Sequence, residues 1–438
     1  MGTSIELELG GISLDYAKNH MGNDHGFLFQ ESDRTRRHAD GIDYGYFAEH
    51  SDDEELGRNE ACFVRPLRRV LPRLDLLGQT VKAARSEYEA VVGQALEYSS
   101  TGDVDNAREA SGFMSFEEFC DFCNRFKIAD LDSTYIEGMT DERDRIARGR
   151  FDALAEELSR IPHGFDHQLY WSERSFFGSA VCILSAYSML QVFGRGEANL
   201  DVEVMWQFGP IVEAGWVTED SFHGGAGRRH SILVATEGTS DARILRRAID
   251  ILKPDVADFF RFIDVDQSHP FPGTGNLVKF AEGLVHIDVQ NRILFVLDND
   301  AEGLAGFHRI EAMQKPVNMR AMMLPHLEEF KGFPARGPEG INPSDINERA
   351  AAIECYLDLR LAGRPDAEVV WSNYKREIGR WHGALEHKDT YTRRFLEQSD
   401  ESLRDGSYDT RKLEIVLSAL IVEATALAVG DFAPADGD

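Results

Sequence analysis

Ser231-Ile-Leu-Val-Ala-Thr-Glu-Gly-Thr-Ser-Asp241 is a short apolar run that ends in a glutamate, and the chain repeats this pattern in Arg292-Ile-Leu-Phe-Val-Leu-Asp-Asn-Asp-Ala-Glu-Gly303. Similar apolar runs occur at 259–265 and 319–324, and stretches with helical spacing follow the first three runs. Short apolar strands that alternate with helices are typical of a parallel sheet covered on both faces. We therefore expect an α/β domain in the C-terminal half of the chain.

Acidic residues follow two of these predicted strands directly. Glu237 comes after the first run, with Asp241 one helical turn later, and Asp298 and Asp300 come after the third. Ligands of open α/β sheets bind beyond the carboxyl ends of the strands. Two carboxylates about 5 Å apart repel each other by roughly 3 kcal/mol at an effective dielectric near 20. A cluster of this kind therefore predicts a divalent cation, and oxygen ligands suit Mg²⁺ or Mn²⁺.

Glycines accompany the acids. Gly238 and Gly303 would let the backbone turn sharply and approach a phosphate closely, and Gly273-Thr-Gly-Asn276 offers a further turn of this kind. Asp241 has an alternative interpretation, because an aspartate in the first turn of a helix also stabilises the helix dipole.

The two motifs resemble those of the Toprim domain, which is shared by topoisomerases, bacterial primases and OLD-type nucleases. The resemblance covers residues 228–358, with weaker similarity to about Phe395. It implies that Glu237 takes part in acid–base chemistry or metal binding. It also implies that Asp298 and Asp300 hold Mg²⁺.

Two later segments are similar to the OLD-type branch in particular. Glu354, at the end of Asn347-Glu-Arg-Ala-Ala-Ala-Ile-Glu354, corresponds to an acid in a late helix of that branch. Lys388, at the end of Trp381-His-Gly-Ala-Leu-Glu-His-Lys388, corresponds to its distal lysine, which would offset charge on the phosphate. Asp241 and Glu354 would hold a second metal ion. The alternatives are an ordinary helix acid for Glu354 and an ordinary surface lysine for Lys388.

The resemblance implies a Mg²⁺-dependent nuclease acting on DNA or RNA, tRNA included, and an effector role in defence against phage. No tyrosine-bearing strand-passage domain and no zinc spacing is evident, so a topoisomerase or a primase is disfavoured. The alternative is a Toprim-fold protein that binds nucleic acid, or senses it in a complex, without cutting. The implied partners are nucleic acid, an ATPase or sensor protein, and further copies of the chain, but no membrane.

Residues 1–227 form the first of two predicted domains, and residues 228–438 form the second. The chain changes character at Gly224-Gly-Ala-Gly-Arg-Arg-His230, a glycine-rich and basic break. Ahead of it we expect short strands near the N-terminus, as in Ser4-Ile-Glu-Leu-Glu-Leu9, and then a mainly helical domain. The opening residues resemble an N-terminal module found ahead of Toprim and HEPN domains in bacterial conflict-system proteins. Helices are predicted at 67–96, 140–161, 176–193 and 345–361, and further helices between 369 and 427.

Composition limits the remaining possibilities. The net charge of −29 argues against tight unaided binding to duplex nucleic acid, which usually needs a basic surface. The chain has only 5 scattered cysteines and no apolar run long enough to span a membrane, so a cytoplasmic protein is expected.

Three smaller patterns have competing interpretations. Cys120 and Cys123 form a CxxC within an aromatic stretch, where core packing is the better account. Arg160 with His167, and Arg376 with His382, match the loose spacing of HEPN ribonuclease sites, a pattern that arises easily by chance. The arginines of the segment before and within the first long predicted helix fit either phosphate contacts or a solvated helix start; they are Arg65, Arg68, Arg69 and Arg73.

Overall fold

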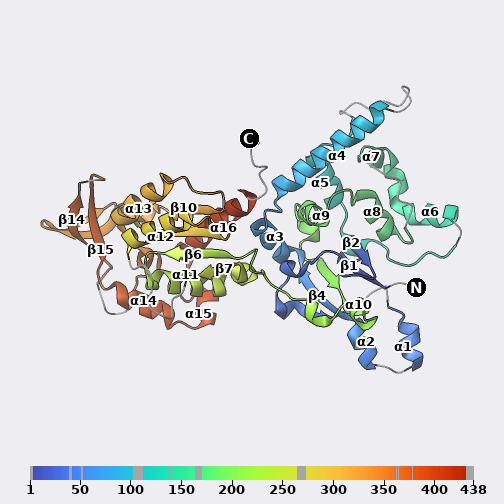
Figure 1. Ribbon diagram of the computed structural model, residues 1–438, viewed down its shortest axis with the longest axis horizontal. Helices are drawn as coiled ribbons and strands as arrows, with labels where there is room; N and C mark the ends of the chain where they lie inside the picture. The colour runs from blue at the N-terminus through green and yellow to red at the C-terminus, as the bar shows by residue number, and fades with distance from the viewer. Residues whose placement is uncertain are drawn as a thin grey trace. The chain divides into compact units, whose positions relative to one another are not determined.

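The computed structural model describes residues 3–38, 42–50, 53–101, 112–138, 140–162, 170–263, 273–361, 363, 365–376 and 378–430. The chain divides into two compact units, Met1–Ala226 and Gly227–Asp438 (Figure 1). Each unit has its own sheet and its own hydrophobic core, and each is described by itself.

The N-terminal unit contains an antiparallel sheet with strand order β2-β1-β5-β4-β3. The alternation predicted for β1 is confirmed, because Ile5, Leu7 and Leu9 are buried and the residues between them are not. β5 enters between β1 and β4 although it follows them by more than a hundred residues. The strands are β1 (Ser4–Leu9), β2 (Ile12–Lys18), β3 (Arg34–Arg36), β4 (Ala61–Pro66) and β5 (Glu203–Gln207).

Three helices predicted for this unit are broken in the structure. The first is interrupted at Gly78, whose φ of 78° is not helical. The second is interrupted at Gly149, with φ 44°. The third bends by 109° before Ser185, whose N–H and hydroxyl are both bound by the carboxylate of Glu87. The observed elements are α3 (Leu67–Leu76), α4 (Val81–Thr101), α6 (Thr140–Arg148), η6 (Gly149–Leu154), α7 (Ala155–Ser159), α8 (Glu173–Val181) and α9 (Ala186–Phe193).

The core of the N-terminal unit is rich in aromatic rings and includes both cysteines of the CxxC. Cys120 and Cys123 lie in α5 (Phe116–Asn124) and are buried among core side chains, which confirms the packing interpretation. Burial raises the pKa of Cys120 to about 11, so neither a reactive nor a metal-bound thiolate is favoured there. Three short helices complete the unit: α1 (Tyr44–His50), α2 (Asp53–Asn59) and α10 (Gly209–Glu213).

Two of the four arginines at the start of the first helix are structural, and neither interpretation offered for them fits. Arg65 is fully buried and pairs with Asp33 at 3.3 Å. Arg73 is also fully buried and donates to the carbonyls of Phe27 and Phe29. These side chains hold the loop that precedes β3 and are not placed to contact a phosphate.

The C-terminal unit is built on a parallel sheet with strand order β10-β8-β6-β7. The four predicted apolar runs all form strands, so the α/β fold expected for this half is confirmed. Every residue of β8 is buried, as a strand covered on both faces requires. α12 and α13 pack against each other, and α11 and α16 do the same, as Figure 1 shows. The strands are β6 (Ile232–Thr236), β7 (Phe260–Phe262), β8 (Arg292–Leu297) and β10 (Met319–Met323), and the helices between them are α11 (Thr239–Leu252), α12 (Thr274–His286) and α13 (Ala301–Glu311).

The predicted helix at 345–361 is wrong. This segment forms the short strand β13 (Ala350–Ala351) and the single 3₁₀ turn η11 (Ile353–Tyr356). β13 pairs with β9 (Asn299–Asp300), and the side chain of Asn347 bonds to Leu327, so tertiary contacts replace local helical ones. The apolar residues of this segment are buried by these contacts.

The helix expected from residue 369 is also wrong at its start, because residues 369–385 form a hairpin. Its strands belong to a small sheet with order β12-β11-β14-β15, and true helices begin only at Lys388. The elements are β11 (Phe333–Gly337), β12 (Gly340–Ser344), β14 (Val369–Lys375), β15 (Arg380–Leu385), α14 (Lys388–Leu396), α15 (Asp400–Arg404) and α16 (Arg411–Gly430).

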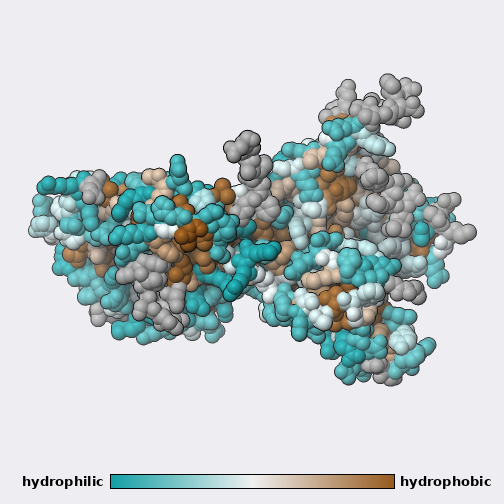
Figure 2. All heavy atoms as spheres, in the orientation of Figure 1, coloured by the Kyte–Doolittle hydropathy of each residue, from teal (hydrophilic) through white to brown (hydrophobic). Residues whose placement is uncertain are grey.

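α16 is long and apolar enough to cross a membrane by length and composition alone. It packs against β8, β10 and α11, and buries Leu413, Leu417 and Leu420, as a core helix does. Its outer side leaves Ile415 and Val422 exposed, and Figure 2 shows hydrophobic side chains at the surface where Figure 1 draws β10 and α16.

Candidate metal centre

The candidate site begins where β6 and β8 end side by side. Thr236 and Val296 are register partners in the parallel ladder, so Glu237 and Asp298 leave neighbouring strands at the same edge of the sheet. The N–H of Asp298 donates to Oε1 of Glu237 at 3.0 Å, and the hydroxyl of Thr274 donates to its Oε2. The chain therefore brings two predicted site residues into direct contact.

Asp241 lies in the first turn of α11, beside the same edge. Its carboxylate accepts the N–H of Gly238 at 2.8 Å and the hydroxyl of Ser240 at 3.1 Å. This contact ties the helix start together, as the alternative interpretation expected. The charge of Lys388, the first residue of α14, also reaches Asp241 and lowers its pKa, although other causes are larger.

Asp300 is the N-cap of α13. Its Oδ1 accepts the N–H groups of Glu302 at 2.8 Å and Gly303 at 2.7 Å. Oδ1 of Asp298 accepts the N–H of Ile353 at 3.0 Å, from the segment that was expected to be a helix. The tight pairing of β9 with β13 makes this second contact possible.

Glu354 joins the site through η11, although no helix carries it there. The residue is buried, with 3% of its surface exposed, and its charge acts on both Asp241 and Asp298. The buried side chain of Asn299 fixes this segment, because its amide binds Asn347 at 3.0 Å and the hydroxyl of Tyr356 at 3.1 Å. Four segments of the C-terminal unit therefore bring the predicted acids near enough for their charges to act on one another.

Burial and mutual repulsion raise the pKa values of four of these carboxyl groups. Burial, and then the charge of Asp300, raises the pKa of Glu237 to about 8. Burial, and then the charge of Glu354, raises the pKa of Asp241 to about 7. Burial raises the pKa of Asp298 well above its usual range, with contributions from the other four acids, and also raises that of Asp300. The charges of all four other acids act on Asp298.

The donors fit a hard divalent cation in type but need side-chain rotation to bind one. In the described parts of the chain, no three histidine, cysteine, aspartate or glutamate side chains lie close enough together to hold a single metal ion. Glu237, Asp241, Asp298 and Asp300 each direct an oxygen to a backbone N–H instead. These N–H groups offset part of the negative charge that a cation would neutralise.

The glycines have other roles than the predicted sharp turns. Gly238 has an extended backbone, with φ −144°, which any residue adopts. Gly303 is required by packing, because an added Cβ would lie 2.1 Å from the carbonyl oxygen of Asp298. Only Gly273 has the positive φ, 87°, that favours glycine, and it begins the turn into α12 beside Thr274. Contact with a phosphate stays a prediction for Gly238 and Gly303.

A comparison with protein families bears on the N-terminal unit. The protein-family model described as HEPN/Toprim N-terminal domain 1 matches residues 1–230, which is more than half of the chain. The chain belongs to this family. No curated protein and no solved structure matches it significantly.

The HEPN/Toprim N-terminal domain coincides closely with the compact unit Met1–Ala226. The resemblance noted for the opening residues is therefore confirmed. Of the two arginine–histidine patterns, the first includes His167, which lies outside the described residues. The second lies in the C-terminal unit, with Arg376 in the turn and His382 on β15.

His382 lies beside Asp300, a placement that the sequence, which suggested His382 only as part of an arginine–histidine pattern, did not predict. Its Nδ1 lies 3.9 Å from Oδ2 of Asp300, and this buried nitrogen has no hydrogen-bond partner among the described residues. On the same side of the hairpin, Lys375 pairs with Glu302 at 2.6 Å. Because helices were predicted between residues 369 and 427, the sequence did not indicate either interaction. The pairing of β14 with β15 directs these side chains toward α13.

Proposed function

We propose that this protein is a metal-dependent nuclease of Toprim type, which hydrolyses phosphodiester bonds of DNA or RNA. The observation that carries the proposal is the convergence of Glu237, Asp241, Asp298, Asp300 and Glu354 at the carboxyl edge of a parallel sheet. Membership of a family named for HEPN and Toprim domains agrees with a nuclease-related role. An effector function in conflict with phage is the biological context we propose.

The charge of Asp300 acts on Glu237, and the charge of Glu354 acts on Asp241. In our proposal Asp298 and Asp300, with Glu237, hold one Mg²⁺ or Mn²⁺, and Asp241 with Glu354 holds a second. A divalent ion bound there polarises the scissile phosphate and lowers the pKa of a bound water.

Basic and polar groups at the rim would position the phosphate. Lys388 is exposed beside Asp241, where its charge would offset the negative charge that develops on the phosphate. The Nδ1 of His382 points to Asp300, from where it would orient that carboxylate or bind an ion directly.

A non-catalytic protein that binds nucleic acid is the second candidate. One observation favours it: no three potential ligands in the described residues share one ion position. Such a protein would keep the carboxylates for structure or for a regulatory cation. It would bind nucleic acid, but changing the cluster aspartates to asparagine would leave its behaviour in a cleavage assay unchanged.

The deciding experiment compares the native protein with Asp298→Asn/Asp300→Asn. Plasmid DNA, single-stranded DNA and total tRNA are incubated with Mg²⁺, Mn²⁺ or a chelator. We expect metal-dependent cutting that falls by about a hundredfold or more in the variant, because the ion supplies several kcal/mol of transition-state stabilisation. Titration calorimetry with Mn²⁺ should show the loss of binding in parallel.

The matched control is Glu282→Gln/Asp288→Asn, which removes the same charge from exposed positions on and after α12. It should cut and bind Mn²⁺ like the native protein, and circular dichroism should show both variants folded. Full activity of Asp298→Asn/Asp300→Asn would refute the proposal. Cutting by neither protein, together with unchanged Mn²⁺ binding, would favour the non-catalytic candidate.

A further inference from the structure

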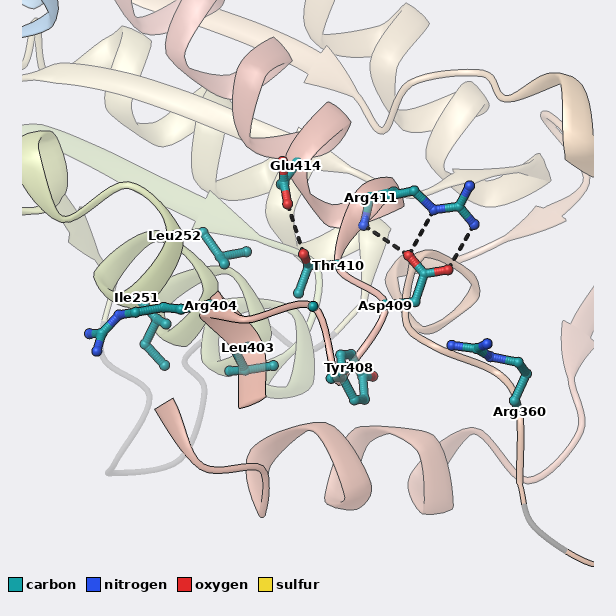
Figure 3. Close-up of a pocket in the computed structure, with 11 residues that line it drawn as sticks. Ile251, Leu252, Arg360, Leu403, Arg404, Tyr408, Asp409, Thr410, Arg411 and Glu414 are labelled. Atoms are coloured by element: carbon teal, nitrogen blue, oxygen red, sulfur yellow. Dashed lines mark hydrogen bonds and ion pairs between the residues drawn. The ribbon is translucent and has the colours of Figure 1, made fainter. Parts of the chain in front are cut away.

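A hollow of about 590 Å³ lies in the C-terminal unit (Figure 3). Leu252, Leu403 and Tyr408 line its apolar part. Arginines from three separate segments surround it: Arg360 follows η11, Arg404 ends α15 and Arg411 begins α16. Asp409 and Glu414 also line it, so in a chain with 76 acidic and 47 basic residues these three arginines give the hollow a small excess of positive charge.

A second hollow, of about 350 Å³, adjoins the first, since Ile251 lines both. Three more arginines line it, and their spacing of three and four residues places them on one face of α11. Asp250 of α11, Leu396 of α14 and Asp400 of α15 also line it. The arginines of this second hollow are Arg243, Arg246 and Arg247.

Only part of this positive charge is neutralised within the protein. Figure 3 shows Arg411 bound through two nitrogens to Asp409, and Arg360 is bound in the same way to Asp358. Arg247 pairs with Asp400 at 3.2 Å. Among the described residues, Arg243 and Arg404 make no hydrogen bond or ion pair, and both side chains are exposed. The remaining acids at the two hollows are Asp250 and Glu414.

Two helices connect the carboxylate cluster with these hollows. α11 has Asp241 in its first turn and ends at Leu252, which lines the first hollow. α14 begins at Lys388, whose charge reaches Asp241, and ends at Leu396, which lines the second hollow. The two helices pack against each other, and both therefore lead from the cluster to the hollows. A helix of 14 residues spans about 20 Å.

We infer that this arginine track, defined as Arg243, Arg246 and Arg404, binds the phosphate backbone of a single nucleic-acid strand that leads to the carboxylate cluster. Arginine forms paired hydrogen bonds with phosphate, and its planar group suits this contact better than lysine does. The inference rests on the proposed function for the direction of the strand, but not for the binding itself.

The test measures affinity without cutting. A fluorescently labelled single-stranded oligonucleotide is titrated with full-length protein in a chelator, at several salt concentrations, and anisotropy gives the dissociation constant. The variant is Arg243→Gln/Arg246→Gln/Arg404→Gln. The matched control is Arg261→Gln/Lys279→Gln/Lys331→Gln, which removes the same charge from exposed positions of the same unit outside both hollows.

We expect the track variant to weaken binding about tenfold or more. The slope of log K against log salt should fall by roughly 2, at about 0.7 for each phosphate that the variant no longer neutralises. The control should change neither quantity. Equal weakening in both variants, an unchanged slope, or no binding by the native protein would overturn the inference.

Two further results separate this inference from the proposed function. Unlabelled polyglutamate that competes as well as an oligonucleotide of equal charge would indicate an acidic protein partner and would also overturn the inference. If the native protein cuts nucleic acid but the track variant binds the oligonucleotide normally, the nuclease proposal stands and the track inference fails. If the track variant loses binding but the native protein cuts nothing, the track inference stands and the nuclease proposal fails.

Discussion

The carboxyl groups of the candidate site carry an energetic conflict that the protein only partly relieves. Glu237, Asp241, Asp298 and Asp300 each accept a backbone N–H, which favours the ionised form. Burial and like charges act against ionisation and are stronger, because all four pKa values are raised. Without a cation, some of these groups are therefore protonated near neutral pH.

This conflict predicts how stability depends on pH. The folded pKa values of Glu237 and Asp241, about 8 and about 7, lie above the unfolded values of 4.5 and 3.8. Between these limits the folded state binds more protons than the unfolded state, so the free energy of unfolding falls as pH rises. Thermal melts in a chelator from pH 5 to pH 8 should show a loss of a few kcal/mol, at about 1.36 kcal/mol for each pKa unit. Mg²⁺ should remove most of this loss, because it binds the ionised groups.

The variant Glu237→Gln distinguishes the effect of this carboxyl group from a general dependence of stability on pH. At pH 8 in a chelator it should melt a few degrees above the native protein, since a repulsive charge is gone. Added Mg²⁺ should then raise its melting temperature less than it raises that of the native protein. Glu282→Gln, an exposed change on α12, should melt like the native protein. A melting temperature that rises with pH in the native protein would contradict the account.

At the scale of elements, the pairing of β9 with β13 completes the site. Asn299 is fully buried and links both strands, because its Oδ1 also accepts the N–H of Glu348 at 2.7 Å. Glu348 has a φ of 55°, a conformation that costs energy outside glycine and that this contact holds in place. Without the pairing, Glu354 would have no reason to approach Asp298.

We predict that Asn299→Ala destabilises the protein by about 2–3 kcal/mol, since it leaves buried polar partners unsatisfied. It should also weaken Mn²⁺ binding by about tenfold, which is the lower end of the effect seen when a residue that orients a metal ligand is removed. Denaturant melts and calorimetry measure the two quantities. The control Asn318→Ala removes amide bonds to Val289 and Asn291 in the same unit. It should lower stability without changing Mn²⁺ affinity, and an equal effect of both variants on Mn²⁺ would refute the assignment.

At the scale of the whole molecule, the division at Ala226 and Gly227 separates two units with cores of their own. Arg228 and Arg229 follow the boundary and are exposed. Every predicted site residue belongs to the C-terminal unit, whereas the family match belongs to the N-terminal one. The assignment of family and the proposal of function thus rest on different halves of the chain.

This organisation predicts the outcome of limited proteolysis. Trypsin at low ratio should cut after Arg228 or Arg229 and release two fragments of nearly equal mass, because exposed connections between compact units are cleaved first. Mass spectrometry would identify the new N-terminus at Arg229 or His230. The doubly changed protein Arg228→Gln/Arg229→Gln should lose this early cut. Early cleavage elsewhere, with the boundary intact in the native protein, would contradict the prediction.

The sequence by itself determined the features that depend on local pattern. Period-two alternation identified β1, and continuous apolar runs identified β6 and β8, because burial on one or both faces requires these patterns. The acids that follow β6 and β8 could be predicted to meet, since parallel strands deliver their carboxyl ends to one edge. The strand-end glutamate and the two aspartates needed no tertiary information.

Only the tertiary structure decided the features that depend on distant contacts. Residues 345–361 have helical spacing, yet β13 forms because it pairs with β9. Asn299 of β9 also binds the hydroxyl of Tyr356, which follows β13. The hairpin of β14 and β15, and with it the placement of His382, follows from pairing within a second sheet. The pairings of β13 with β9 and of β14 with β11 join residues far apart in sequence and leave no periodic signal within either segment, so the local pattern gives no sign of them.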